Sequence, residues 1–413
     1  MSAHAEKMEP VGGPVLTTPV KILGALAVLG LVLIAYREAT GLGAATAMND
    51  GYPWGFWIAF DVVVGTALAT GGYAVAILIY ILNRGRYHPL IRSAILTSAL
   101  GYTLGGIGVM LDLGRFWNTT KLPLFWNWNL NSVLLEVALC ISLYTLVLWI
   151  ELSPAFLERW REAKNERLRK VSRKGLPIIE RAMPWLLALG LLLPTMHQSS
   201  LGSLMILSGP KLHPLWQTPL LPLLFLLSCI GMGYAAVVIE STLSTSVFRL
   251  RDETPVLAGL STAMLTVLGL YLVVRVVDIT ARGKLPLVFA GDGYSLLFLL
   301  EMLLFIAAIV MLLMKEKLTD AGHLFRTAMV VVTAGALYRF STFLIAYRPA
   351  VGGWHYFPAL TEILITLGLV SAEVVAYIFV VKRFPVLSSA RAPVARMTFD
   401  VKTTEPVGMK TGV

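Results

Sequence analysis

Three ionisable side chains stand inside long apolar stretches of this sequence. Asp61 lies in FWIAFDVVVG, Glu136 in SVLLEVALC and His197 in LLPTMHQSSLG. An ionisable group within a bilayer is costly and is by default a functional candidate, and carboxylates and imidazoles are groups that move protons. We therefore predict these three as catalytic residues for proton transfer inside a membrane. A hydrogen-bonded structural carboxylate, or a satisfied core histidine, is the alternative for each.

The predicted depths of these side chains bring them together. At about 1.5 Å per residue from the outer edge of each span, Asp61 lies roughly 10 Å down, Glu136 roughly 6 Å down and His197 near the midplane. Asp112 stands at the outer rim. Tyr102, near the midplane of the third span, would connect these groups to deeper water. The pattern predicts one cluster in the outer half of the second to fifth spans.

An aromatic and amide-rich mouth is predicted above this cluster. Trp54 and Trp57 precede Asp61 by seven and four residues, and the loop DLGRFWNTTKLPLFWNWNLNS follows the third span. Such a lining favours a flat, amphipathic ligand head. The predicted ligand-binding residues are Trp54, Trp57, Asp61, Asp112, Arg115 and His197. The alternatives are an interfacial aromatic belt for the tryptophans and a rim ion pair for Asp112 and Arg115.

A second set of charged residues lies mostly in the later spans. Together with Tyr102 and Glu136 it makes up the predicted proton path, whose other members are Glu240, Arg275, Asp278, Glu301, Arg339, Glu362 and Glu373. Glu240 ends the sixth span on the predicted cytoplasmic side, where it would take up protons below His197. The alternatives are buried ion pairs that hold a second bundle together and, for Glu240, an ordinary interfacial carboxylate.

Hydropathy predicts the elements that carry these residues. Of the 413 residues, 57% are hydrophobic and only 14% are charged, which is typical of an integral membrane protein rather than a soluble one. Ten apolar stretches are long enough to cross a bilayer and predict an all-α membrane domain. The predicted spans are 20–38, 53–82, 91–113, 132–152, 184–208, 215–240, 256–278, 293–314, 323–346 and 359–381.

Basic residues predict the orientation, because Lys and Arg collect in loops that are not translocated. About 25 of the 34 Lys and Arg fall on the side of the termini, so both termini are predicted to be cytoplasmic. We expect a leader at 1–19, a membrane domain at 20–382 and a tail at 383–413. The basic run at 158–175 predicts an interfacial or solvated helix that anchors the topology, with a partner-docking site as the alternative.

The sequence lacks the residues that several kinds of chemistry require. Cys140 and Cys229 have no second Cys or His nearby at ligand spacing, so neither an iron–sulfur cluster nor a metal centre is expected. Of six histidines only His197 is mid-span. A haem held between two imidazoles is thus disfavoured, and we predict a chain without haem, with a rim haem held by an outer-loop histidine as the alternative. No nucleotide-binding motif and no basic–aromatic interleaving is present, so nucleic acid is not expected as a partner.

Seven stretches carry a family resemblance: GYPWGFWIAFDVVVGTALATGGYA, NRGRYHPLIRSA, GYTLGGIGVMLDLGRFWN, NSVLLEVALC, LLPTMHQSSLGSLMI, HPLWQ and FAGDGYS. They resemble the NrfD/PsrC family over nearly the whole chain, most closely the HybB-like membrane subunits of hydrogenase-2-type complexes. The resemblance implies two four-helix bundles, with spans one and ten peripheral. Spans two to five would bind a quinone, menaquinone or ubiquinone, near the outer face, and spans six to nine would form the second bundle.

The same resemblance implies a haem-free subunit of the bacterial inner membrane that is not catalytic alone. Electrons would come from a periplasmic ferredoxin-like iron–sulfur subunit, fed by the large and small subunits of a [NiFe] hydrogenase, and proton transfer would be coupled to quinone reduction. Subunits of polysulfide, nitrite or sulfur-metabolism complexes share the family. Two other functions stay open: a secondary transporter, for which Pro194 is the one plausible helix break, and a passive membrane anchor.

Overall fold

Helices form every named element of the computed structural model, which describes residues 8–350 and 352–387. The α-helices are α1 (Thr18–Thr40), α2 (Leu42–Ala45), α3 (Gly65–Leu68), α4 (Gly71–Ala76), α5 (His88–Asp112), α6 (Val133–Trp160), α7 (Glu166–Leu207), α8 (Leu221–Phe248), α9 (Thr254–Ala281), α10 (Leu285–Val288), α11 (Gly293–Leu313), α12 (Ala321–Phe340) and α13 (Leu360–Arg383). The predicted all-α fold is confirmed for this part of the chain. Residues 1–7 of the predicted leader and 388–413 of the predicted tail lie outside it.

Shorter segments complete the helical elements. Three are π-helical: η1 (Trp57–Val62), η2 (Ile77–Ile81) and η8 (Ser341–Ile345). Five are 3-10 helices: η3 (Gly85–Tyr87), η4 (Phe116–Lys121), η5 (Phe125–Asn127), η6 (Gly209–Lys211) and η7 (Lys315–Thr319). Ten helical stretches in the described chain are long and apolar enough to cross a membrane, as hydropathy predicted. The largest difference is at the fifth, which begins at Glu166 rather than near residue 184.

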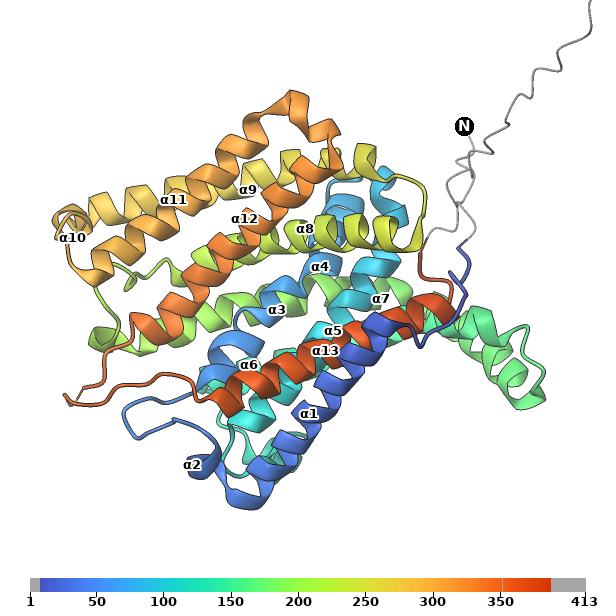
Figure 1. The fold of residues 1–413 in the computed structure, drawn as a ribbon, viewed down its shortest axis with the longest axis horizontal. Coiled ribbons are helices and arrows are strands. Elements are labelled where there is room, and N and C mark those ends of the chain that lie inside the picture. Colours follow the sequence, from blue (N-terminus) through green and yellow to red (C-terminus); the bar gives the residue numbers. More distant parts are fainter. Residues whose placement is uncertain (1–7, 351, 388–413) are drawn as a thin grey trace, which may run out of the picture.

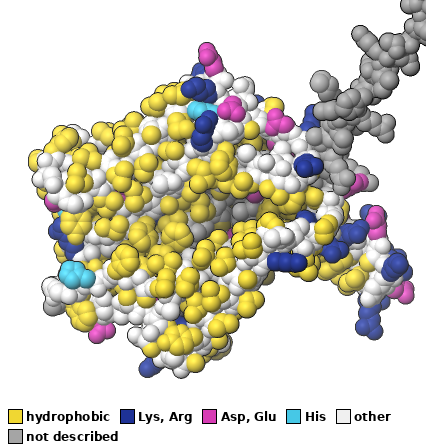
Figure 2. All heavy atoms as spheres, in the orientation of Figure 1, with side chains coloured by type: hydrophobic (Ala, Val, Ile, Leu, Met, Phe, Trp, Pro, Cys, Tyr) yellow, Lys and Arg dark blue, Asp and Glu magenta, His cyan; other side chains and the backbone are white. Residues whose placement is uncertain are grey.

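The lateral surface has the apolar character that a lipid environment requires. Leu31 of α1 and Leu303 of α11 are 62% and 61% exposed. Figure 2 shows hydrophobic side chains across this face, and Lys and Arg gathered on the hairpin between α6 and α7. Exposed apolar helices of this length are stable in a bilayer, because each helix satisfies its own backbone hydrogen bonds. The chain is therefore a multi-pass membrane protein.

The α6–α7 hairpin extends well beyond a membrane span. With 42 residues, α7 is about 63 Å long, against about 30 Å for a hydrocarbon core. The basic run at 158–175 is divided between the end of α6, a turn and the start of α7, where Asn165 caps the helix by accepting from the Arg167 backbone N–H (2.9 Å). Figure 1 shows the hairpin leaving the main body of helices at one end.

The second span is interrupted by turns, and the ninth ends in the π-helix η8. The second span runs through η1, α3, α4 and η2, with turns at residues 63–64 and 69–70. Backbone carbonyls freed by such irregularity must find partners inside the protein. At the second of these turns, the Thr70 hydroxyl donates from Oγ1 to the Cys229 carbonyl of α8 (2.9 Å). Pro194, the plausible break that a transporter would require, does not end a helix, because α7 continues through that proline.

The first and last spans pack backbone to backbone. A Cβ built on Gly368 of α13 would lie 2.6 Å from the Gly30 Cα of α1, so only glycines fit at this crossing. At the end of the molecule that carries the hairpin, the Gly12 N–H donates to the Lys382 carbonyl (3.2 Å). Residues that precede α1 and residues that end α13 therefore lie side by side, as Figure 1 also shows.

α8 is the most central helix. It packs against α3, α4, α5 and α7 on one side and against α9 and α12 on the other. Its glycines allow close approach: a Cβ on Gly233 would lie 2.8 Å from Thr70 Oγ1. α13 packs on α1 and α5. The second to fifth spans thus lie between α8 on one side and α13 with α1 on the other.

Candidate functional site

His197 lies at the centre of the second to fifth spans. Its side chain is fully buried, and its Nε2 is 3.2 Å from Thr66 Oγ1 in α3. The Thr66 hydroxyl donates its hydrogen to the Val62 carbonyl (2.5 Å), so a neutral imidazole must donate from Nε2 to Thr66. Nδ1 is then an acceptor, and it has no hydrogen-bond partner in the described part of the chain. His197 can therefore accept a proton at Nδ1.

Gln198 and Tyr102 extend this arrangement. Gln198 Nε2 donates to Thr66 Oγ1 (3.1 Å) and to Tyr102 Oη (3.4 Å), and both side chains are fully buried. The Tyr102 ring is T-shaped to the His197 ring, with 5.6 Å between centroids. We call Thr66, Tyr102, His197 and Gln198 the histidine cluster. It is a continuous set of polar groups in an otherwise apolar interior.

Glu136 lies next to the histidine cluster. Ser200, three residues after His197 on α7, donates from Oγ to Glu136 Oε1 (2.7 Å). Glu136 is in the first turn of α6 and is only half-buried, whereas His197 is fully buried. α6 and α7 pack along their length. The structure therefore brings two of the three predicted catalytic residues together, with the carboxylate nearer the surface.

Asp61 is hydrogen-bonded to a residue of α13. Its Oδ2 accepts a hydrogen bond from Thr366 Oγ1 of α13 (2.8 Å), and it is 2% exposed. A Cβ on Gly108 of α5 would lie 3.0 Å from the Asp61 Cβ, so the aspartate packs against bare backbone. Asp61 thus faces α5 and α13, and its recorded hydrogen bond does not join it to Glu136 or His197.

Both predicted tryptophans are buried, so neither belongs to an exposed aromatic belt. Trp54 Nε1 donates to the Phe343 carbonyl in η8 (3.0 Å), which ties the start of the second span to the ninth. Trp57 is fully buried in an apolar cluster with Leu104 and Ile365, and its Nε1 has no partner. Trp54 therefore packs between spans, and Trp57 lies beside α13.

The rim pair proposed for Asp112 and Arg115 does not form. Asp112 instead accepts the Gly55 backbone N–H at both carboxylate oxygens (3.0 and 3.2 Å), which fixes the start of the second span. Arg115 is exposed. Arg37 of α1 supplies the nearby cation: its Nη2 donates to the Leu111 carbonyl (2.8 Å) and its Nη1 pairs with Glu38.

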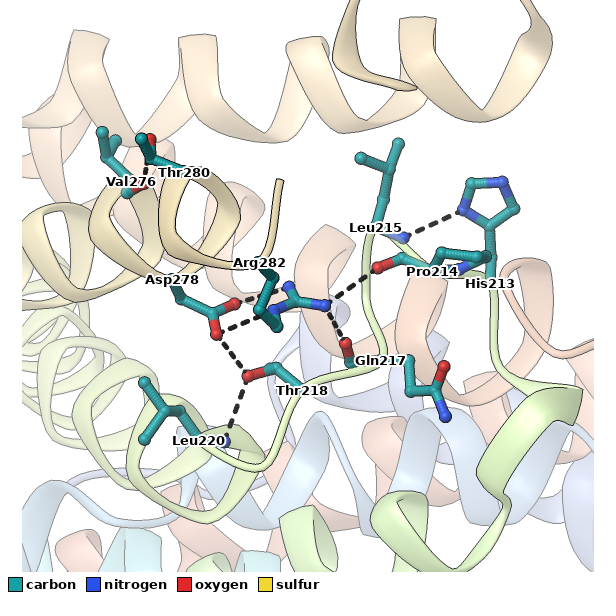
Figure 3. Close-up of polar contacts among 10 residues, drawn as sticks. All are labelled: His213, Pro214, Leu215, Gln217, Thr218, Leu220, Val276, Asp278, Thr280 and Arg282. Carbon is teal, nitrogen blue, oxygen red and sulfur yellow. Dashed lines mark hydrogen bonds and ion pairs between the residues drawn. The ribbon is translucent and has the colours of Figure 1, made fainter. Parts of the chain in front are cut away.

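Asp278 forms a clamp at the C-terminal end of α9, as Figure 3 shows. Arg282, one turn later, pairs with both Asp278 oxygens (2.9 and 2.6 Å) and donates to the carbonyls of Pro214 and Gln217. Thr218 Oγ1 donates to Asp278 Oδ1 (2.6 Å). This network fastens the α7–α8 loop to α9. Asp278 has a structural ion pair, with Arg282 rather than with another predicted path residue.

Arg275 and Glu301 are both fully buried between the later spans. Glu301 accepts from Trp216 Nε1 (3.1 and 3.3 Å). The Arg275 guanidinium lies over the Phe298 ring, 5.0 Å from its centroid, and none of its nitrogens has a hydrogen-bond partner among the residues that the structure describes. A buried pair between these two residues, one of the predicted alternatives, is therefore not formed by direct contact.

Arg339 joins the two halves of the protein. From α12 it donates Nη1 to the Val63 carbonyl of the interrupted second span (3.0 Å) and Nη2 to the Phe225 carbonyl of α8 (2.5 Å). A regular second span would not offer the Val63 carbonyl. The guanidinium thus satisfies backbone groups instead of a carboxylate.

The remaining path carboxylates have separate surroundings. Glu240 accepts from the hydroxyls of Tyr377 and Ser244. Glu362 caps α13, accepting the Ala359 backbone N–H (2.8 Å) and the Tyr356 hydroxyl. Glu373 is on α13, the helix that also carries Thr366, and it lies beside Gly101 of α5. None of these three forms an ion pair with an arginine in the described residues.

The loop between α7 and α8 holds a buried histidine, His213. The His213 ring stacks on Tyr294 (4.4 Å between centroids), and its Nδ1 accepts the Leu215 N–H. Burial, aided by the positive charge of Arg348, lowers the pKa of His213 to about 4, while Asp292 opposes the shift. His213 is therefore neutral at physiological pH and acts as a structural acceptor.

Sequence reasoning missed the polar partners: Thr66, Gln198, Ser200 and Thr366. Hydroxyl and amide residues are common in membrane helices, so nothing in their type distinguishes them. Gln198 and Ser200 follow His197 directly, and the polar run HQSS within an apolar helix was the one available signal. In the described chain, no three His, Cys, Asp or Glu residues are grouped to hold a metal ion.

Two relatives of established name are similar to the chain. The probable Ni/Fe-hydrogenase 2 b-type cytochrome subunit of Escherichia coli (strain K12) is 41% identical over 92% of this chain and 95% of the relative. The menaquinone reductase integral membrane subunit of Nitratidesulfovibrio vulgaris (Hildenborough) is 33% identical over 51% of this chain and 49% of the relative. The chain is thus related to membrane subunits of hydrogenase-2-type and quinone-reductase-type complexes.

The prediction of a chain without haem is contradicted by the first of these names. The Escherichia coli relative is called a b-type cytochrome subunit, which points to haem. The expectation was drawn from counting histidines and from the family resemblance. Counting was a weak argument, because it tested only one way of holding a haem, between two mid-span imidazoles.

The described histidines do not supply that two-imidazole site. His197 bonds to Thr66, His213 to the Leu215 N–H, and His323 Nε2 lies 3.1 Å from the Met311 carbonyl. Their ring contacts are with tyrosine or tryptophan, and no pair of imidazoles is in contact among the described residues.

A family profile settles the wider relationship. The profile described as polysulphide reductase, NrfD matches residues 44–352, which include eight of the ten candidate spans of the described chain. The matched region contains the interrupted second span, the histidine cluster and Glu136. Together with the 41% identity to the Escherichia coli subunit, this match shows that the chain belongs to the NrfD family of membrane proteins.

Proposed function

We propose that this chain is the membrane subunit of a respiratory oxidoreductase of the bacterial inner membrane. It passes electrons from a periplasmic ferredoxin-like iron–sulfur subunit, fed by a [NiFe] hydrogenase, to a membrane quinone. The names of the hydrogenase-2 and menaquinone reductase relatives support this proposal. The termini would be cytoplasmic, spans two to five would form the quinone-binding bundle and spans six to nine the second bundle.

The observation that carries the proposal is the position of the histidine cluster beside Glu136. Reduction of a quinone consumes protons as well as electrons, so its carbonyl oxygens need proton-bearing groups within hydrogen-bond reach. Glu136 is half-buried near the outer end of α6, and Ser200 links it to the helix that carries His197. A quinone head beside Glu136 would be close to the outer surface, where an iron–sulfur partner delivers electrons.

The residues would divide the work of proton transfer. Glu136 binds and protonates the quinone oxygen, and His197, which has an unpartnered Nδ1, returns a proton to the site through the histidine cluster. Asp61, held by Thr366, is the second carboxylate of the region. Tyr102 and Glu240 would lead inward to the cytoplasm. Proton uptake from that side would make quinone reduction electrogenic.

Substitution of the three residues tests this function. In membranes that contain the partner subunits, Asp61→Asn, Glu136→Gln and His197→Ala should each lower hydrogen-dependent quinone reduction by about tenfold or more, because a positioned acid–base group contributes at least that much. Glu162→Gln, at an exposed position on the hairpin, is the matched control. Normal rates in all three variants would instead identify a passive membrane anchor.

A further inference from the structure

A small cavity lies between the second, third, fourth and fifth spans, on the hairpin side of the histidine cluster. Apart from apolar side chains, it is lined by Tyr73, Tyr144, Glu151 and Gly190. It has room for on the order of one water molecule. None of the sequence-based site predictions includes this place. It belongs to neither Glu136 nor Asp61.

Glu151 makes this cavity polar. Its Oε1 is buried and has no hydrogen-bond partner within residues 8–350 and 352–387. A Cβ on Gly190 would lie 2.8 Å from that oxygen, so the carboxylate lies where the facing helix has no side chain. A buried oxygen without a partner is unfavourable, and a water molecule in the cavity would satisfy it.

Glu151 lies toward the end of α6 that leads into the hairpin. It lies 15 residues after Glu136 on α6, or about 22 Å along the helix axis, and nine residues before α6 ends at Trp160. The end it approaches also carries the hairpin and the paired ends of α1 and α13. In the proposed orientation, Glu151 is in the cytoplasmic half of the membrane.

Two tyrosines that line the cavity lie close to the histidine cluster, without a direct hydrogen bond to it among the described residues. Tyr73 Oη and Thr195 Oγ1 are 2.7 Å apart, and Thr195 is two residues before His197 on α7. The Tyr144 ring lies edge-on to Tyr102, a cluster member, with 4.6 Å between centroids. Hydroxyls of this kind pass protons along hydrogen-bonded chains when water completes the gaps.

We propose that this cavity is a water-binding proton-uptake site in which Glu151 receives protons from the cytoplasmic side for the histidine cluster. The inference rests on the proposed quinone reduction. The Glu151 carboxylate takes a proton from water, releases it toward Tyr73 and Thr195, and returns to the carboxylate. The proton ends on a quinone oxygen, and the electrons come from the iron–sulfur partner.

Glu151→Gln in the intact complex, reconstituted in sealed vesicles with hydrogen as donor, tests this role. We expect quinone reduction and proton uptake from the cytoplasmic side to fall together by about tenfold or more, while Glu162→Gln remains normal. Glu151→Asp should recover part of the rate. Gly190→Ala, which displaces the carboxylate without removing its charge, should give an intermediate loss.

A spectroscopic measurement separates chemistry from folding. Infrared difference spectra of quinone reduction should contain a carboxyl C=O band that Glu151→Gln removes and Glu162→Gln retains. Normal proton uptake and an unchanged band in Glu151→Gln, with impaired His197→Ala, would overturn the Glu151 inference alone. Normal rates in Glu151→Gln, Glu136→Gln and His197→Ala together would overturn the proposed function as well.

Discussion

Thr66 determines which nitrogen of His197 is reactive. Its hydroxyl hydrogen is used on the Val62 carbonyl, so its oxygen can only accept from His197 and Gln198. A valine at this position would have nearly the same shape but would leave the Nε2–H without an acceptor. The histidine's orientation thus depends on a residue in a different span, 131 positions away in sequence.

At this scale, the ionisable residues could be predicted from the sequence, but their hydrogen-bond partners could not. Asp61, Glu136 and His197 stand out because ionisable side chains are rare in apolar segments. The hydrogen-bond partner of Asp61, Thr366, is 305 residues away in sequence. One sequence without a structure contains no information on which of many threonines meets a given carboxylate.

His213 should make the folded protein sensitive to acid. Its pKa is about 4 in the fold and near 6.5 when exposed, so the unfolded chain binds more protons between these values. Stability from this residue is full above about pH 6.5 and decreases as the pH falls toward 4. The melting temperature of the purified protein, measured from pH 7 to 4, should fall accordingly.

His213→Asn provides the comparison, because its amide oxygen can accept the Leu215 N–H but does not titrate in this range. Between pH 7 and 4, the melting temperature of the variant should fall less than that of the wild type. Equal losses in both proteins would show that other groups control the acid response.

At the scale of elements, hydropathy predicted every span but not the irregular course of the second. Residues 63–70 contain Gly65 but no proline, and their composition is that of an ordinary apolar helix. The turns there are stabilised by partners from other spans: Arg339 at the Val63 carbonyl and Cys229 at the Thr70 hydroxyl. Pro194, the local signal for a break, is accommodated within α7.

Gly368→Ala should weaken the packing of α13 on α1. The new methyl group would lie 2.6 Å from the Gly30 Cα, and backbone cannot move aside as a flexible side chain does. Overpacking of this kind costs about 1–3 kcal/mol. We expect a lower melting temperature in detergent and, because Thr366 is on the same helix, a weaker hold on Asp61.

Gly24→Ala is the control on α1, since a Cβ at Gly24 meets nothing within 4 Å. It should leave the melting temperature unchanged or raise it slightly, as alanine is the better helix former. A destabilised Gly24→Ala, or an unaffected Gly368→Ala, would contradict this account of the crossing.

At the scale of the whole molecule, the basic residues of the hairpin and the paired ends of α1 and α13 lie at the same polar end. The α6–α7 hairpin, with its run of Lys and Arg, lies at the end where residues before α1 meet the end of α13. Positive charge of this kind is retained in the cytoplasm and attracted to anionic lipid.

Cysteine labelling tests the proposed orientation. Glu162→Cys places a thiol at a side chain that is 82% exposed, while the native Cys140 and Cys229 are buried. A membrane-impermeant maleimide should label this variant in inside-out vesicles and not in right-side-out ones. Labelling confined to right-side-out vesicles would reverse the proposed topology.

The pairing of the first and last spans also bears on biogenesis. α1 leaves the ribosome before the nine other candidate spans of the described chain, yet its main partner, α13, follows all of them. Until α13 is inserted, lipid must cover the face of α1 that α13 later occupies. Contacts between residues far apart in sequence are slow to form, because the intervening chain must be ordered first. Asp61 therefore acquires its hydrogen-bond donor, Thr366 of α13, only after the nine preceding spans have been made.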